Sequence, residues 1–201
     1  MKVLFYDTES TDLAASFGRL LCTSFLYLDE KDPWTIRGDQ KPYKGRNAID
    51  DSKLAVATRD TLEAADIIVG WNSILHDVAF INGRLAKAGE RPCHLGEKYG
   101  TWHLDLMWYA GGQSMKLGGK SLNNVSRFFD SPNRKTPLDG DIWQLAGTGD
   151  SGAMDSVVEH CEYDVRVTKD MWPHLAPYVK KFTFSLSEVW SVVDQIPSRQ
   201  R

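Results

Sequence analysis

The sequence opens with the stretch MKVLFYDTES, residues 1–10, in which a short apolar run leads directly into two acidic residues. The run from Val3 to Tyr6 predicts a buried strand, and side chains two apart on a strand point to the same face. Asp7 and Glu9 are therefore expected to lie together, although like charges repel and are costly to bury. They are either solvated acids where the strand leaves the core, or half of a site for Mg²⁺ or Mn²⁺, which prefer oxygen ligands.

The bulk composition indicates one globular domain: 42% of the 201 residues are hydrophobic and 25% are charged. A formal net charge of -3 argues against a protein that wraps nucleic acid by bulk electrostatics, but not against an enzyme that grips a few nucleotides. The three cysteines lack CxxC spacing, which indicates neither a zinc site nor a disulfide framework. Without a signal-peptide pattern or a membrane-length apolar segment, we expect a cytoplasmic protein with no membrane partner.

The apolar pattern predicts strands first and then an alternation of strands and helices, which is typical of an α/β sandwich around a mixed sheet. Strands are expected at 3–7, 19–29, 33–37, 67–72 and the start of 101–110, and helices at 52–66, 78–88, the end of 101–110, 120–129 and 154–172. Pro173 is expected to end the last helix, and residues 150–152 are expected to form a loop. Four tryptophans are expected in the core: Trp102, Trp108, Trp143 and Trp172.

Three further residues can complete a metal site. Asp77 follows a predicted strand, at the point where the chain enters a helix in GWNSILHDVAFINGRL. His160 and Asp164 are four residues apart in HCEYDVRVT, which places them on one helix face. Taken singly, Asp77 is equally well explained as a helix cap, and the other two as a surface pair. The set in this order is far more specific than any one member.

With these residues the chain resembles the DEDD exonucleases, which have a ribonuclease H-like fold and include the proofreading domains of DNA polymerases. The resemblance covers roughly residues 1 to 180 and is carried by Asp7-x-Glu9, by Asp77 after a strand and by Asp164 on a late helix. The stretches WNSILHDVAFINGRLAKAG and SLNNVSRFF…KTPLDGDIW…VVEHCEYDV are most similar to predicted exonucleases related to family-B polymerase proofreading domains.

Two positions depart from the pattern of that family. His76 stands before Asp77, where the family usually has an aromatic residue, and His160 has the spacing at which one subclass has tyrosine. The subclass therefore stays open, and the role of His160 is less firmly implied than the roles of the four acids.

The resemblance implies a ribonuclease H-like α/β fold, a mixed β-sheet flanked by helices, in a domain spanning residues 1–182 with a C-terminal tail at 183–201. It implies a metal-dependent 3′–5′ exonuclease that hydrolyses phosphodiester bonds at the 3′ ends of single-stranded DNA or RNA, with DNA favoured. The four acids would bind two Mg²⁺ or Mn²⁺ ions, and His160 would orient the attacking water or accept its proton.

Further residues are candidates for contacts with the substrate or with partners. Thr8 could offer its amide or hydroxyl group to a terminal nucleotide, and Asn72 stands where the resemblance implies contact with the substrate strand. Asp105 is interpreted as structural rather than as a group that tunes the site. The tail, with a short amphipathic stretch and a basic end, could dock a replication or repair partner. Two other functions stay open, an endonuclease on the same fold and a catalytically weak nucleic-acid-binding module.

Overall fold

The computed structural model describes residues 1–47, 49–96, 99–111, 115, 117–133 and 137–179, so the predicted tail at 183–201 lies outside the described residues. Its framework is a five-stranded mixed sheet with the strand order β3-β2-β1-β4-β5. The strands are β1 (Val3–Ser10), β2 (Leu20–Tyr27), β3 (Trp34–Arg37), β4 (Ile67–Gly70) and β5 (Trp102–Asp105). The predicted fold class, a mixed sheet flanked by helices, is thereby confirmed.

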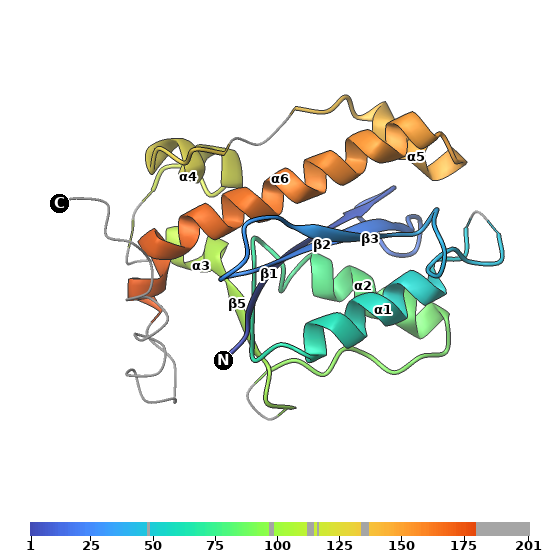
Figure 1. The fold of residues 1–201 in the computed structure, drawn as a ribbon, viewed down its shortest axis with the longest axis horizontal. Helices are drawn as coiled ribbons and strands as arrows, with labels where there is room; N and C mark the ends of the chain where they lie inside the picture. Colours follow the sequence, from blue (N-terminus) through green and yellow to red (C-terminus); the bar gives the residue numbers. More distant parts are fainter. Residues whose placement is uncertain (48, 97–98, 112–114, 116, 134–136, 180–201) are drawn as a thin grey trace.

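Helices cover both faces of this sheet (Figure 1). On one face lie α1 (Ser52–Glu63) and α2 (Asp77–Lys87). The long helix α6 (Ser151–Leu175) crosses the other face, and three shorter helices pack against it: α3 (Leu106–Gly111), α4 (Leu122–Phe128) and α5 (Asp141–Thr148). A short 3₁₀ turn, Ala176–Tyr178, follows α6. Within the described residues, no helix has the length and apolar character needed to cross a membrane.

The central strand β1 is apolar at consecutive positions because both of its faces are covered. Val3 and Phe5 join the core beneath α6, where the ring of Phe5 meets Trp172 edge-on at 5.9 Å. Leu4 and Tyr6 point the other way, into the core formed with α1 and α2. The same alternation places the side chains of Asp7 and Glu9 on the face of β1 that Val3 and Phe5 occupy, toward α6.

The pairing of β1 leaves its acidic end open on one side. It runs antiparallel to β2 as far as Ser10, whereas its parallel pairing with β4 covers only Val3 to Phe5. Because β1, β4 and β5 are parallel, their carboxyl ends lie at the same edge of the sheet. This edge of an α/β sheet is where ligands commonly bind.

Several local predictions about the elements were wrong. Helix α6 does not stop at Pro173 but continues to Leu175, whose side chain is fully buried and holds the last turn in place. Its first turn includes residues 151–152, because the side chain of Asp150 accepts a hydrogen bond of 2.8 Å from the amide of Ala153. Helix α5 was not predicted; it spans only eight residues, too few for a helical repeat to stand out from the sequence. Trp108, expected in the core, is 55% exposed.

Candidate metal centre

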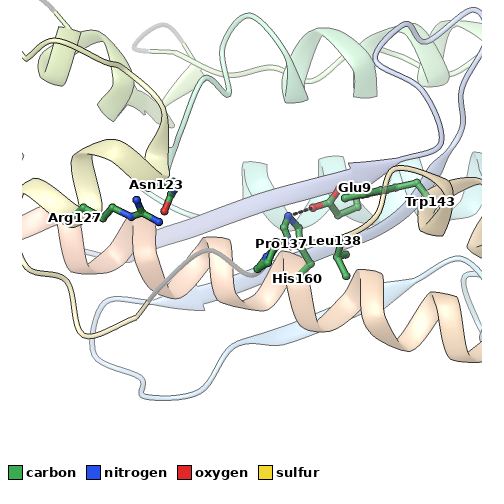
Figure 2. Close-up of a pocket in the computed structure, with 7 residues that line it drawn as sticks. All are labelled: Glu9, Asn123, Arg127, Pro137, Leu138, Trp143 and His160. Atoms are coloured by element: carbon green, nitrogen blue, oxygen red, sulfur yellow. Dashed lines mark hydrogen bonds and ion pairs between the residues drawn. The ribbon is translucent and has the colours of Figure 1, made fainter.

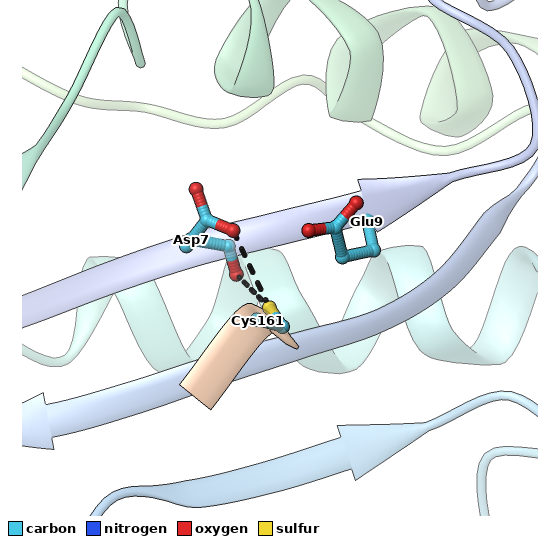
Figure 3. Close-up of side chains that lie close together, drawn as sticks. All are labelled: Asp7, Glu9 and Cys161. Carbon is cyan, nitrogen blue, oxygen red and sulfur yellow. Dashed lines mark hydrogen bonds between the residues drawn. The ribbon is translucent and has the colours of Figure 1, made fainter. Parts of the chain in front are cut away.

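The first two acids lie where β1 meets α6. Asp7 and Glu9 are half-buried and face the helix that crosses this side of the sheet (Figure 3). The Sγ atom of Cys161, on α6, lies 3.3 Å from the carbonyl oxygen of Asp7 and 3.5 Å from its Oδ2 atom. The ligand-type atoms of Asp7, Glu9 and Cys161 all lie within 4.8 Å of one another. The alternation along β1 therefore brings the two carboxylates together, as the sequence predicted.

Helix α6 brings His160 and Asp164 to the same place. Both side chains are buried, although both are polar. The Nε2 atom of His160 lies 3.8 Å from Oε1 of Glu9 and 3.9 Å from Oδ2 of Asp164. The imidazole thus stands between one acid of β1 and one acid of α6. Cys161 was not singled out from the sequence, but its position three residues before Asp164 on the same helix face was a usable signal.

Asp77, the first residue of α2, reaches the end of β1 through Thr8. Its Oδ1 atom accepts hydrogen bonds from the amide of Thr8 at 3.1 Å and from the hydroxyl of Thr8 at 2.5 Å. Burial raises the pKa of the Asp77 carboxyl group from 3.8 to about 6, against the opposing effect of the Thr8 hydrogen bond. The hydroxyl of Thr8, expected to contact substrate, thus positions an acid in this structure.

The turn after β4 is held by Asp105. Its carboxylate accepts hydrogen bonds from the amides of Asn72, Ile74 and Met107, at 2.9, 3.2 and 3.1 Å. Asn72 has a positive φ of 61°, a left-handed conformation that asparagine tolerates better than most residues. Asp105 is buried, and these bonds give it a structural role: it shapes the turn that leads from β4 to Asp77.

A contact that the sequence did not reveal comes from α5. The indole Nε1–H of Trp143 donates a hydrogen bond of 2.6 Å to Oε2 of Glu9. The same indole ring meets the His160 ring edge-on, with centroids 5.5 Å apart. Trp143, expected in the core, is partly buried against a core cluster, and it also holds one candidate metal ligand and packs against the candidate proton acceptor.

A pocket of about 430 Å³ opens beside these residues. Figure 2 shows Glu9, Trp143 and His160 on one side of it and two polar residues of α4 on the other. Its lining consists of Glu9, Asn123, Arg127, Pro137, Leu138, Trp143 and His160.

The donor atoms gathered here fit a hard divalent cation. Carboxylate oxygens of Asp7 and Glu9 are the ligands that Mg²⁺ and Mn²⁺ prefer. Burial raises the pKa of the Cys161 thiol well above its usual value, so the thiol is protonated at neutral pH and donates toward Asp7. Two further candidate carboxylates stand apart from the group formed by Asp7, Glu9 and Cys161: Asp164 within α6, and Asp77 at the start of α2.

Comparisons with known proteins agree with this architecture. A model of the RNase_H superfamily matches residues 4–176. Among solved structures, the family B DNA polymerase from the hyperthermophilic archaeon Pyrobaculum calidifontis matches with a TM-score of 0.69 and 17% sequence identity. That match covers 89% of this chain and 25% of the polymerase chain, so this chain spans about a quarter of the polymerase's length. A comparison with curated proteins gives no match.

Proposed function

The chain belongs to the RNase_H superfamily, and from this premise we propose that it is a metal-dependent 3′–5′ exonuclease that acts on the 3′ ends of single-stranded nucleic acid, DNA in preference to RNA. One observation carries the proposal. Carboxylates of β1 and α6 converge on a histidine that lines a pocket, with His160 3.8 Å from Glu9 and 3.9 Å from Asp164. Acids so arranged suit hydrolysis of a phosphodiester bond.

Four acids would hold two Mg²⁺ or Mn²⁺ ions: Asp7, Glu9, Asp77 and Asp164. When bound, such ions lower the pKa of a water molecule and neutralise charge on the departing 3′ oxygen. Trp143 holds the Glu9 carboxylate in one orientation through its 2.6 Å hydrogen bond. Thr8 holds Asp77 in the same way through its amide and hydroxyl groups.

His160 is proposed to act on the attacking water. Its Nε2 atom faces both Glu9 and Asp164, so a water bound beside these acids is within reach of the imidazole. An imidazole titrates near neutral pH and can accept a proton during attack. Asn72, in the turn after β4, is proposed to contact the terminal nucleotide, whereas the amide and hydroxyl groups of Thr8 bind Asp77 instead.

A digestion assay tests this function. A 5′-labelled single-stranded oligonucleotide, incubated with Mg²⁺ or Mn²⁺, should give a descending ladder of products and should stay intact with chelator. Early release of a labelled 5′ mononucleotide would show the opposite polarity, and cutting of a closed circle would show an endonuclease. Binding without any cleavage would show a nucleic-acid-binding module. DNA and RNA of the same sequence, compared in parallel, test the preference for DNA.

A further inference from the structure

The side of the pocket that faces away from the acids is formed by α4. Asn123 and Arg127 are four residues apart on this helix, and both line the pocket (Figure 2). Buried Leu122 and Val125 fix α4 against the core, and the side chain of Ser121 caps its first turn with a 3.3 Å bond from Asn124. The helix therefore presents one cationic and one amide side chain to the pocket from a fixed position.

Arg127 is available to a ligand. The residue is exposed, and no ion pair involves it in the part of the chain that the structure describes. Arg166 on α6, by contrast, pairs with Glu162 at 3.7 Å, and Arg37 pairs with two aspartates. A guanidinium group that lines a pocket without such a partner can form paired hydrogen bonds with an anion such as phosphate.

The rest of the pocket has the chemistry of one nucleotide site. The pocket is also lined by the apolar side chains of Pro137 and Leu138 and by the indole of Trp143. A volume of about 430 Å³ is in the usual range for small-molecule sites. A phosphodiester strand carries one negative charge per nucleotide, and a site built from carboxylates repels that strand. A cation beside the site offsets this repulsion.

We infer that Arg127, assisted by the amide group of Asn123, binds the backbone phosphate next to the scissile one. The substrate strand then crosses the pocket from α4 to the acids, with a base or sugar against Trp143 and Leu138. This inference rests on the proposed exonuclease function, because that function places the scissile phosphate at Asp7 and Glu9. It assigns Arg127 to substrate binding and not to the chemical step.

The test combines a variant with a modified substrate. Oligonucleotides that carry one neutral methylphosphonate linkage, moved stepwise from the 3′ end, are digested by wild type, Arg127→Gln, Arg127→Lys and Lys87→Gln. Lys87 is an exposed residue of α2, on the other face of the sheet, and its substitution by glutamine removes the same charge. We expect wild type and Lys87→Gln to lose about tenfold in kcat/KM when the linkage beside the scissile phosphate is neutral.

Arg127→Gln should lose about tenfold on the unmodified strand, mainly through KM, and should lose nothing further at that neutral linkage. Arg127→Lys should fall in between, since it keeps the charge without the paired geometry. The slope of log affinity against log salt should weaken by about 0.7 in Arg127→Gln. Unchanged kcat/KM in this variant, or undiminished sensitivity to the neutral linkage, would overturn the inference.

Binding of the same oligonucleotides, measured with Ca²⁺ by fluorescence anisotropy, separates the two ideas. If wild type binds these strands in Ca²⁺ but never cleaves them with Mg²⁺ or Mn²⁺, the exonuclease proposal fails. The subsite is then still judged by the affinity that Arg127→Gln loses relative to Lys87→Gln. Equal affinities of these two variants would overturn the phosphate subsite even in an active enzyme.

Discussion

Two regions of the molecule bury carboxylates in opposite ways. Beside α1 and α2, Asp51 accepts hydrogen bonds from Nε and Nη2 of Arg84 at 2.7 and 2.8 Å, and another from the amide of Leu20 at 2.7 Å. The remaining guanidinium nitrogen of Arg84 donates to the carbonyl oxygens of Ala15 and Gly18. The negative charge of this acid is neutralised within the protein, and the pair ties α2 to the loop after β1.

On the α6 side of the sheet, the carboxylates are clustered instead. The contacts described for Glu9 include the indole of Trp143 and the ring of His160, and the same ring faces Asp164. These contacts orient acids that come from two packed elements, β1 and α6. The first arrangement serves folding, whereas the second concentrates negative charge that a divalent cation can compensate.

The largest effect is expected from Asp164→Asn. The change removes one charge from the acid cluster while keeping its shape, so nuclease activity should fall by about 10³-fold or more. The gain in thermal midpoint on adding Mg²⁺ or Mn²⁺ should shrink as well, because fewer ligands hold the ion. Glu159→Gln, an exposed change on the same helix, is the control. Full activity with an unaltered metal response would refute the four-acid site.

His160→Phe should separate chemistry from metal binding. General-base assistance is typically worth about 10² to 10⁴ in rate, so kcat should fall by that factor. Stabilisation by metal should stay close to wild type, because the histidine is not proposed as a ligand. His160→Tyr should recover part of the activity, since tyrosine is the residue that the resemblance implies at this spacing. A wild-type kcat in the phenylalanine variant would show that His160 only packs in the helix and takes no part in the chemical step.

Arg84→Met should lower the stability of the fold without lowering kcat. It leaves the Asp51 carboxylate buried without its guanidinium partner, which typically costs about 3 to 5 kcal/mol. The thermal midpoint should drop by about 10 °C, measured by circular dichroism, while kcat at a permissive temperature is retained. Lys87→Met, an exposed change on the same helix, should shift stability by no more than about 0.5 kcal/mol. Loss of metal response in Arg84→Met would break the division between the two regions.

The pH dependence of the metal-free protein should report on Asp77. Burial raises the pKa of its carboxyl group from 3.8 to about 6, so the native state binds more protons than the unfolded state between these values. The contribution of Asp77 to the free energy of unfolding therefore falls as pH rises from 3.8 to about 6, and levels off above that. Thermal melts in chelator, compared between wild type and Asp77→Asn, should show a steeper decline for wild type. Parallel curves would contradict this contribution.

The smallest effect is expected from Trp143→Phe. The change removes the N–H group that donates to Glu9 but keeps an aromatic ring against His160. Losing one hydrogen bond to a partly exposed carboxylate should lower kcat/KM roughly tenfold. Trp108→Phe, at an exposed position on α3, should leave activity unchanged. Equal rates for both variants would mean that Glu9 is oriented without the indole.

Much of the site could be predicted from short-range periodicities of the sequence. The alternation of a strand places Asp7 and Glu9 on one face, and the helix repeat places His160 and Asp164 together. The run of apolar residues before Asp7 indicates a strand covered on both faces, which is the central strand of the sheet. These features depend on residues only a few positions apart, so the chain itself determines them.

Only the tertiary structure decided which distant side chains complete the site. Trp143 meets Glu9 across 134 positions of sequence, and Cys161 meets Asp7 across 154. No local pattern encodes such contacts, because they depend on how helices dock on the sheet. The same holds for the continuation of α6 through Pro173, which the burial of Leu175 favours over the local preference of proline. Periodicity determines the direction of each side chain, whereas packing of whole elements determines what that side chain meets.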